Sequence, residues 1–177
     1  MKAGFLLLFS AVYCVNCYAI PKDDPLSHDA IVFYKEKWTN VLSEARFYND
    51  ADKKRLTYVI ENTGKTIKIK RKGNLAVISH PAISITADMN LDRETKDLWY
   101  CRDGKWLIEE IDNVFDIEIK DYNHDDVDDV LVFSGCCDSV YLHLYKNLRT
   151  AVVKTQELHF IGTLDRYEKN GRSYIEY

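Results

Sequence analysis

Hydrophobic and polar positions alternate along much of the chain. The segments Thr66–Lys70 and Phe115–Lys120 switch strictly between apolar and charged residues, the two-residue period of a half-buried strand. Turn signals separate such runs, namely Asn62-Thr63-Gly64, Lys72-Gly73-Asn74, Asp103-Gly104 and Asn170-Gly171. Asp-Gly and Asn-Gly favour hairpins, because a type I′ turn needs positive φ at both central residues. From Leu56 onward the pattern predicts ten or eleven short strands.

These strands predict a mainly β fold. We expect one domain over residues 27–177, built from antiparallel hairpins as a barrel, a sandwich or a stack like propeller blades. The segment Ser27–Phe47 has a different pattern, with Ser27 placed to cap a helix. Its apolar residues fall at helical spacings: Ile31, Tyr34, Trp38, Val41, Leu42 and Ala45. Although Ala30–Tyr34 alone would suit a strand, the spacing predicts an N-terminal helix.

The first residues have the pattern of a secretory signal peptide. A positive charge at Lys2 precedes the apolar run Gly4–Val12, and Cys17 and Ala19 occupy the two small-residue positions of a cleavage site. The run is shorter than the roughly 20 residues that a membrane span needs. We therefore expect residues 1–19 to be a signal peptide, 20–26 a mobile linker, and the chain to be exported, periplasmic or secreted. A lipid anchor on Cys17 is less favoured, because the residues before it match a lipobox poorly.

Composition narrows the possible partners. The chain has 177 residues with a net charge of −4, so a strongly basic nucleic-acid binder is disfavoured. No second segment is apolar enough to cross a membrane. One stretch is basic, with Lys65, Lys68, Lys70, Arg71 and Lys72. Such a stretch is commonly a solvated face that blunts a sheet edge. The alternative is a patch facing an anion, such as an acidic polysaccharide, lipid headgroups or an acidic protein.

Export would place the remaining cysteines, Cys101, Cys136 and Cys137, in an oxidising compartment. Three cysteines allow at most one intramolecular disulfide. We expect Cys101 to pair with Cys136 or Cys137, and a vicinal Cys136–Cys137 bridge is the alternative. A zinc site is less favoured because no C-x-x-C motif is present.

The segment from Asp121 to Asp129 carries the clearest chemical signal. Asp121, Asn123, Asp125 and Asp129 follow the pattern D-x-N-x-D-x-x-x-D, and alternate oxygens along a tight turn converge on one point. Calcium takes six to eight oxygen ligands. Three carboxylates, the Asn123 amide, the Val127 carbonyl and water would supply them. The alternative is a solvated acidic turn whose side chains cap backbone groups.

An EF-hand is excluded, because Val132 stands where the bidentate glutamate belongs and a buried-strand pattern, Val130–Phe133, follows. The segment resembles the FG-GAP-like calcium loops of integrin-type propeller blades. It is also similar to the single such loop of small exported bacterial β-proteins, some of which are calcium-dependent inhibitors of lysozyme-type enzymes. The resemblance implies calcium ligation by Asp121, Asn123, Asp125, Val127 and Asp129. Asp126 replaces the family's glycine.

The first part of the same pattern, D-x-N-x-D, recurs upstream in Asp88-Met89-Asn90-Leu91-Asp92. This segment is a second cation loop, a degenerate repeat unit or an ordinary polar turn.

Catalytic motifs are absent from the sequence. It contains no G-x-S-x-G, no H-E-x-x-H and no glycine-rich phosphate loop. We therefore expect an exported, calcium-stabilised binding protein without catalytic activity, whose partner is a lytic enzyme, as the resemblance implies, or an envelope glycan. The alternatives are an envelope hydrolase that uses carboxylate chemistry and a structural or adhesive surface module.

Overall fold

The computed structural model describes residues 24–84, 91–136, 138–161, 165–170 and 172–176. The expected signal peptide therefore lies outside the described residues. The helices are α1 (Pro25–Glu44), α2 (Asp50–Glu61) and α3 (Thr63–Thr66). The strands are β1 (Lys68–Lys72), β2 (Leu75–Pro81), β3 (Glu94–Arg102), β4 (Lys105–Glu109), β5 (Val114–Lys120), β6 (Asp129–Cys136), β7 (Ser139–Asn147), β8 (Val152–Ile161), β9 (Asp165–Lys169) and β10 (Arg172–Glu176).

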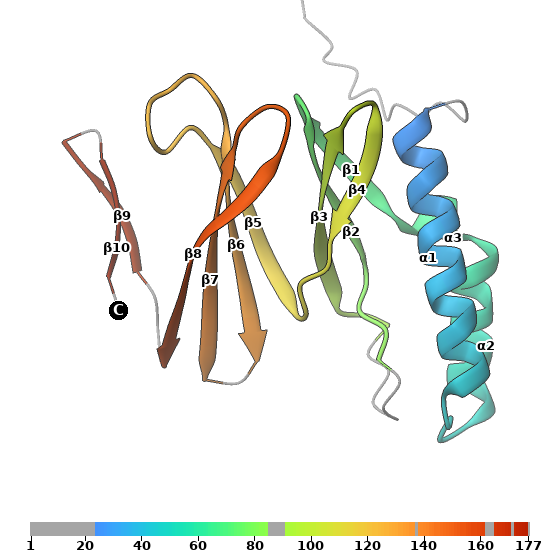
Figure 1. Cartoon of the computed structure of the whole chain (residues 1–177). Helices are drawn as coiled ribbons and strands as arrows, with labels where there is room; N and C mark the ends of the chain where they lie inside the picture. Colours follow the sequence, from blue (N-terminus) through green and yellow to red (C-terminus); the bar gives the residue numbers. More distant parts are fainter. Residues whose placement is uncertain (1–23, 85–90, 137, 162–164, 171, 177) are drawn as a thin grey trace, which may run out of the picture.

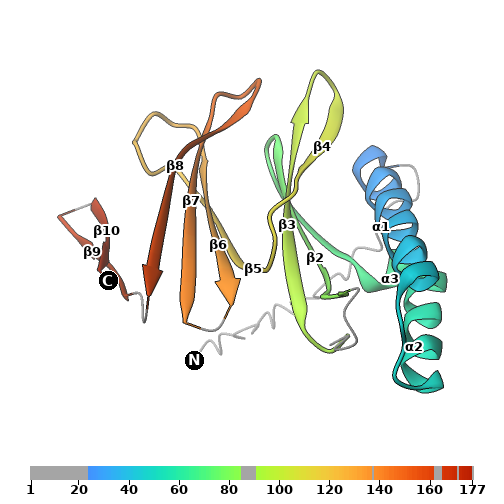
Figure 2. The ribbon, with the colours of Figure 1, turned by 60° about the horizontal axis from the view of Figure 1, so that its bottom comes forward.

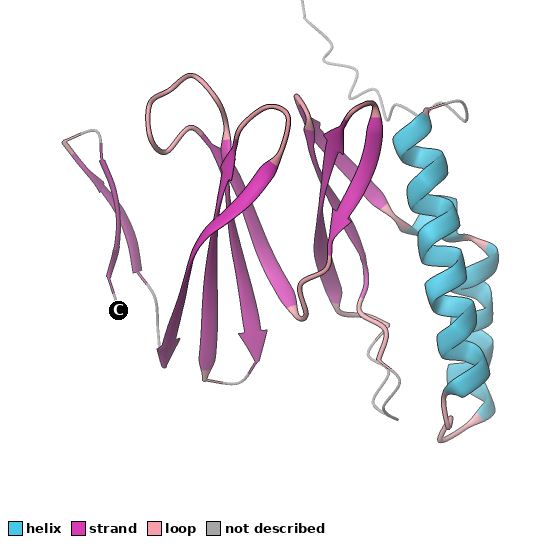
Figure 3. Ribbon diagram, in the orientation of Figure 1, coloured by secondary structure: helices cyan, strands magenta, loops and turns pink. Residues whose placement is uncertain are grey.

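The strands form two antiparallel meanders and a hairpin. The first sheet has the order β1-β2-β3-β4 and the second β5-β6-β7-β8, while β9 pairs with β10. Helices, first sheet, second sheet and hairpin follow one another across the molecule (Figure 1). The helices lie beside the first sheet, away from the second (Figures 2 and 3). The mainly β, hairpin-built fold predicted from the sequence is confirmed. Neither four-stranded sheet closes into a barrel.

Helix α1 forms where helical spacing was expected, but it begins earlier. Pro25 occupies the first turn, where its missing N–H costs nothing, and the Asp24 side chain accepts a hydrogen bond from the Ser27 N–H at 3.2 Å. The cap is therefore Asp24 and not Ser27. Leu26 is fully buried. Pro25 and Leu26, the last two residues of the expected linker over 20–26, therefore belong to the helix, and residues 20–23 lie outside the described residues.

Helix α2 replaces strand structure that the sequence pattern predicted from Leu56 onward. The Asn49 side chain accepts a hydrogen bond from the Asp52 N–H at 3.0 Å. Asp50 and Asp52 in the first turn interact favourably with the helix dipole. Leu56 is buried against α1 and the first sheet. The Asn62-Thr63-Gly64 turn signal likewise falls at the junction of α2 and α3 rather than in a hairpin.

The expected Asp-Gly hairpin is present between β3 and β4. Asp103 and Gly104 have φ values of 53° and 75°, as a type I′ turn requires. Strand β1 begins two residues later than the alternation predicted, and it is an edge strand, as its lysines suggested.

Apolar side chains form three clusters that hold the layers together. The first joins α1 to one face of the first sheet and includes Tyr34, Trp38 and Trp99. The second lies between the two sheets, where Leu75 and Leu98 pack with residues of β5, β6 and β7. The third covers the opposite face of the second sheet. The second cluster positions β5 and β6, and therefore the acidic loop between them.

Candidate metal loop and buried polar networks

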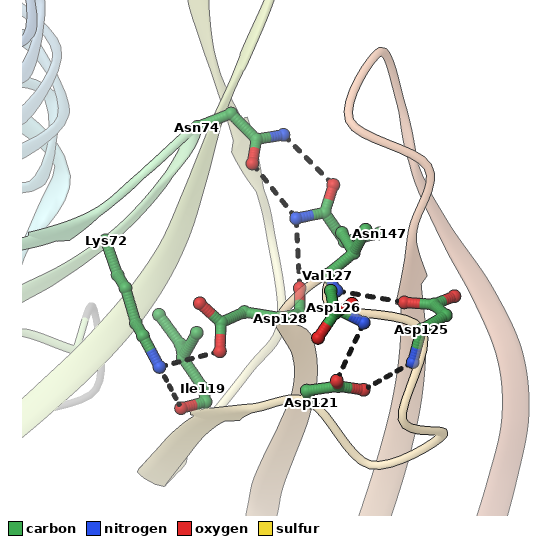
Figure 4. A network of polar contacts seen from close by, with 9 residues as sticks. All are labelled: Lys72, Asn74, Ile119, Asp121, Asp125, Asp126, Val127, Asp128 and Asn147. Atoms are coloured by element: carbon green, nitrogen blue, oxygen red, sulfur yellow. Dashed lines mark hydrogen bonds and ion pairs between the residues drawn. The ribbon is translucent and has the colours of Figure 1, made fainter.

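The acidic segment connects β5 to β6, so the strand–loop–strand arrangement expected from the sequence is confirmed. Its backbone turns around the carboxylate of Asp121 (Figure 4). That carboxylate accepts hydrogen bonds from the N–H groups of Asp125 and Asp126 at 3.2 and 2.9 Å. Desolvation raises the pKa of Asp121, but these N–H groups outweigh it and hold the pKa below its ordinary value. Asp125 in turn accepts from the Val127 N–H at 3.0 Å.

Asp129 begins β6 at the inner end of the loop, and it is only 5% exposed. Its carboxylate accepts hydrogen bonds from the Asn123 amide at 2.9 Å and from the Asn147 N–H at 3.1 Å. Burial, together with the charges of Asp125 and Asp121, raises the pKa of Asp129 despite the Asn147 N–H and Lys146. The carboxylates of the predicted ligand set are therefore close enough to repel one another.

The backbone at Asp126 adopts the conformation that the calcium-loop pattern requires. Its φ is 61°, in the left-handed region where the resembling family has glycine. His124 also has a left-handed φ, of 62°. Two such residues give the loop its tight curl, and both are types that tolerate this region better than most.

The predicted ligands share one loop, but they do not converge on a point. Among the described residues, no group of three or more His, Cys, Asp or Glu side chains is arranged to hold a metal ion. Asp121 and Asp125 turn oxygens toward backbone N–H groups, and the Asn123 amide faces Asp129. The chemistry of the donor set suits a hard cation. The arrangement described is that of a loop capped by its own side chains.

Asn147 ties the loop to both sheets. Its amide donates to the Asp128 carbonyl at 3.0 Å and exchanges a pair of hydrogen bonds with the Asn74 amide, at 2.9 and 3.0 Å (Figure 4). Asn74 belongs to the turn between β1 and β2, so this amide pair spans the two sheets. Beside it, the Lys72 ammonium lies 2.6 Å from the Asp128 carboxylate. Asn147 was not among the predicted functional residues, because its signal in the sequence is only a polar residue at the end of a strand.

A second buried polar network lies between α1 and the first sheet. Asp97 accepts from the Tyr34 hydroxyl at 2.6 Å and lies 2.9 Å from His80 Nε2. His80 Nδ1 faces the Pro81 carbonyl at 2.9 Å. Burial raises the pKa of Asp97, but the His80 contact and the Tyr34 hydrogen bond outweigh it and lower the pKa below its ordinary value. No sequence motif indicated this network, because its members are far apart in the chain.

A serine, a histidine and a glutamate form a row across β6, β7 and β8. The Ser134 hydroxyl lies 2.8 Å from His143 Nε2, and His143 Nδ1 lies 3.2 Å from the Glu157 carboxylate. Burial lowers the pKa of His143 despite Glu157. The order of groups is that of a nucleophilic triad, but Ser134 and His143 are 4% and 7% exposed. The hydroxyl is thus enclosed, and the row links neighbouring strands.

The cysteine prediction is not met in the described residues. Cys101 and Cys136 are free thiols. Cys101 lies on β3 of the first sheet and Cys136 ends β6 of the second, so neither the Cys101–Cys136 nor the Cys136–Cys137 bridge is formed. Cys137 itself lies outside the described residues.

Asp88, Met89 and Asn90 of the upstream acidic segment also lie outside the described residues. Asp92, the last residue of that segment, pairs with Arg55 at 2.8 Å.

Comparisons of the chain with protein-family models, with curated proteins and with solved structures find no match. Within the described residues, none of the helices combines the length and the hydrophobicity of a membrane span.

Proposed function

We propose that the protein is an exported, non-catalytic binding protein whose Asp121–Asp129 loop is stabilised by calcium. One observation carries the proposal. The buried Asp129 shares one loop with the carboxylates of Asp121 and Asp125, and within the described residues only the Lys146 ammonium lies at ion-pair distance from any of the three. A divalent cation among these side chains would offset their repulsion.

The ligands would be the side chains of Asp121, Asn123, Asp125 and Asp129 with the Val127 carbonyl. Bound calcium would supply charge neutralisation and a fixed loop shape, and no chemical step. Lys146 is the one cation that pairs with a loop ligand in the described structure, at 3.7 Å from Asp125, and it leaves most of the negative charge unpaired. The left-handed Asp126 supports the same proposal, because it gives the loop the curl that the resembling loops obtain from glycine.

The bound loop would hold neighbouring turns in a shape that fits a partner. Asn147 and Lys72 connect the loop to the β1–β2 turn, so ordering one would order the other. By the resemblance, the first partner to test is a lysozyme-type enzyme. We expect inhibition of lysozyme turnover that needs calcium and disappears in excess chelator. Unchanged turnover under both conditions would direct the search for a partner to envelope glycans.

Isothermal titration of the metal-free protein with calcium tests the loop directly. We expect one saturable site, with binding abolished in Asp121→Ala. The matched control is Asp112→Ala, which removes an exposed carboxylate outside the loop. Equal calcium affinity in the two variants would refute the assignment.

A further inference from the structure

A groove lies on the face of the first sheet that is turned toward the second. Its volume is about 450 Å³, within the range of small-ligand sites. It is lined by Lys70, Lys72, Val77, Ser79, Lys96, Asp116, Ile117 and Ile119. Strands β1, β2 and β3 thus provide one wall and β5, an edge strand of the second sheet, provides the other.

The positive charges of the groove come from lysines of β1 and β3, the two strands that flank β2. Lys70 pairs across the sheet with Val77, and Lys96 pairs with Ser79. Lys72 faces Asp128 at 2.6 Å, and Lys96 faces Asp116 at 2.9 Å. Within the described part of the chain, Lys70 has no carboxylate at ion-pair distance. The groove therefore holds one ammonium group without a counter-charge, flanked by two others.

Besides the lysines, Ser79 and the Lys96-paired carboxylate of Asp116, the lining is formed by three apolar side chains. Val77 is 8% exposed, and Ile117 and Ile119 of β5 are half-buried opposite it. An inorganic anion would leave this surface in contact with water, whereas a ligand with an apolar body would cover it and gain free energy from the burial. Charge and apolar surface together define an amphipathic ligand.

We propose that this groove binds a small organic anion, with its acidic group at Lys70 and its apolar body against Val77, Ile117 and Ile119. Lys72 and Lys96 would add long-range attraction while keeping their own carboxylate partners. The groove shares Lys72 with the contacts of the acidic loop, so the titration is made in chelator, where its outcome does not depend on calcium binding.

The probe is 8-anilinonaphthalene-1-sulfonate, an aromatic sulfonate whose fluorescence rises in an apolar site. It is titrated into the purified protein at low ionic strength. We expect one saturable site, with affinity at least about threefold weaker in Lys70→Gln, the loss expected for one partly exposed ion pair. Lys70→Arg should restore binding. Lys65→Gln removes an equal charge from the same basic stretch outside the groove, and it should bind the probe as the unmodified protein does.

Competition distinguishes an amphipathic ligand from a bare anion. Decanoate should displace the probe at concentrations where sodium sulfate does not. Equal probe affinity in Lys70→Gln and Lys65→Gln would overturn the site. Displacement by sulfate as effective as that by decanoate would overturn the part assigned to the apolar wall.

Discussion

Asp126 holds a backbone conformation that suits glycine better than any other residue. Its N–H still donates to Asp121, and glycine would keep that hydrogen bond. This position could be recognised in the sequence only by comparison with the loop pattern, since no periodicity indicates a left-handed residue.

Replacing Asp126 with glycine should stabilise the protein. Left-handed strain of about 1–2 kcal/mol is removed, against an entropy cost of about 0.5–1 kcal/mol for glycine, so chemical denaturation should show a gain of roughly 0.5–1 kcal/mol. Calcium affinity should be retained or increased. Asn113→Gly is the control, because Asn113 also has a left-handed φ, of 53°, outside the loop. A loss of stability in Asp126→Gly would contradict the strain argument.

The Asp97–His80 pair predicts a specific response to acid. Because the pKa of Asp97 is lowered on folding, the pair contributes stability that is fully present above the unfolded value of about 3.9 and is lost as pH falls through the folded value. Asp97→Asn should cost about 1–3 kcal/mol at pH 7, because it removes the buried carboxylate that accepts from the Tyr34 hydroxyl and lies beside His80 Nε2. Denaturation curves at pH 7 and pH 3 would measure this. A penalty that does not shrink at pH 3 would show that the charge of Asp97 contributes little.

At the scale of elements, the strands with strict alternation and Asp-Gly turns were predictable from the sequence, because both signals are local. Helix α2 was not predicted. Its Leu56–Ile60 run is rich in apolar and β-branched residues, which periodicity alone cannot separate from a strand. The Asn49 cap and the acidic first turn were the signals that distinguish the two. The acidic loop was found from spacing, whereas Asn147 and the Asp97 network depend on contacts across elements.

The amide pair between Asn74 and Asn147 is one of the polar links between the two sheets, in addition to the Lys72–Asp128 and Lys96–Asp116 ion pairs. Asn147→Ala removes the partner of the half-buried Asp128 carbonyl and of the half-buried Asn74 amide, and each lost hydrogen bond contributes about 0.5–1.5 kcal/mol. Asn74→Ala removes the amide pair but keeps the contacts of Asn147 with the loop. Chemical denaturation should therefore give a larger loss for Asn147→Ala, and a weaker calcium affinity only in that variant. Equal losses of unfolding free energy in the two variants would mean that the contact between Asn147 and the loop does not contribute to stability.

At the scale of the whole molecule, apolar clusters join the helices to the first sheet and the first sheet to the second, and polar links such as the Asn74–Asn147 pair add to the contact between the sheets. The hairpin is connected to β5 by the ion pair between Lys120 and Glu168. Strand β5 thus pairs with the hairpin through Lys120, forms one wall of the groove and leads directly into the acidic loop. A cation that orders the β5–β6 loop would consequently stabilise the contacts between layers and not the loop alone.

Thermal unfolding with calcium and with chelator tests this account most directly. At a calcium concentration about 100 times the Kd, linkage contributes about 2.7 kcal/mol, which raises the Tm by roughly 5–10 °C for a chain of this size. We expect that rise in the unmodified protein and in Asp112→Ala, and none in Asp121→Ala. An unchanged Tm on adding calcium to the unmodified protein would contradict the account and leave the loop as an acidic turn capped by its own side chains.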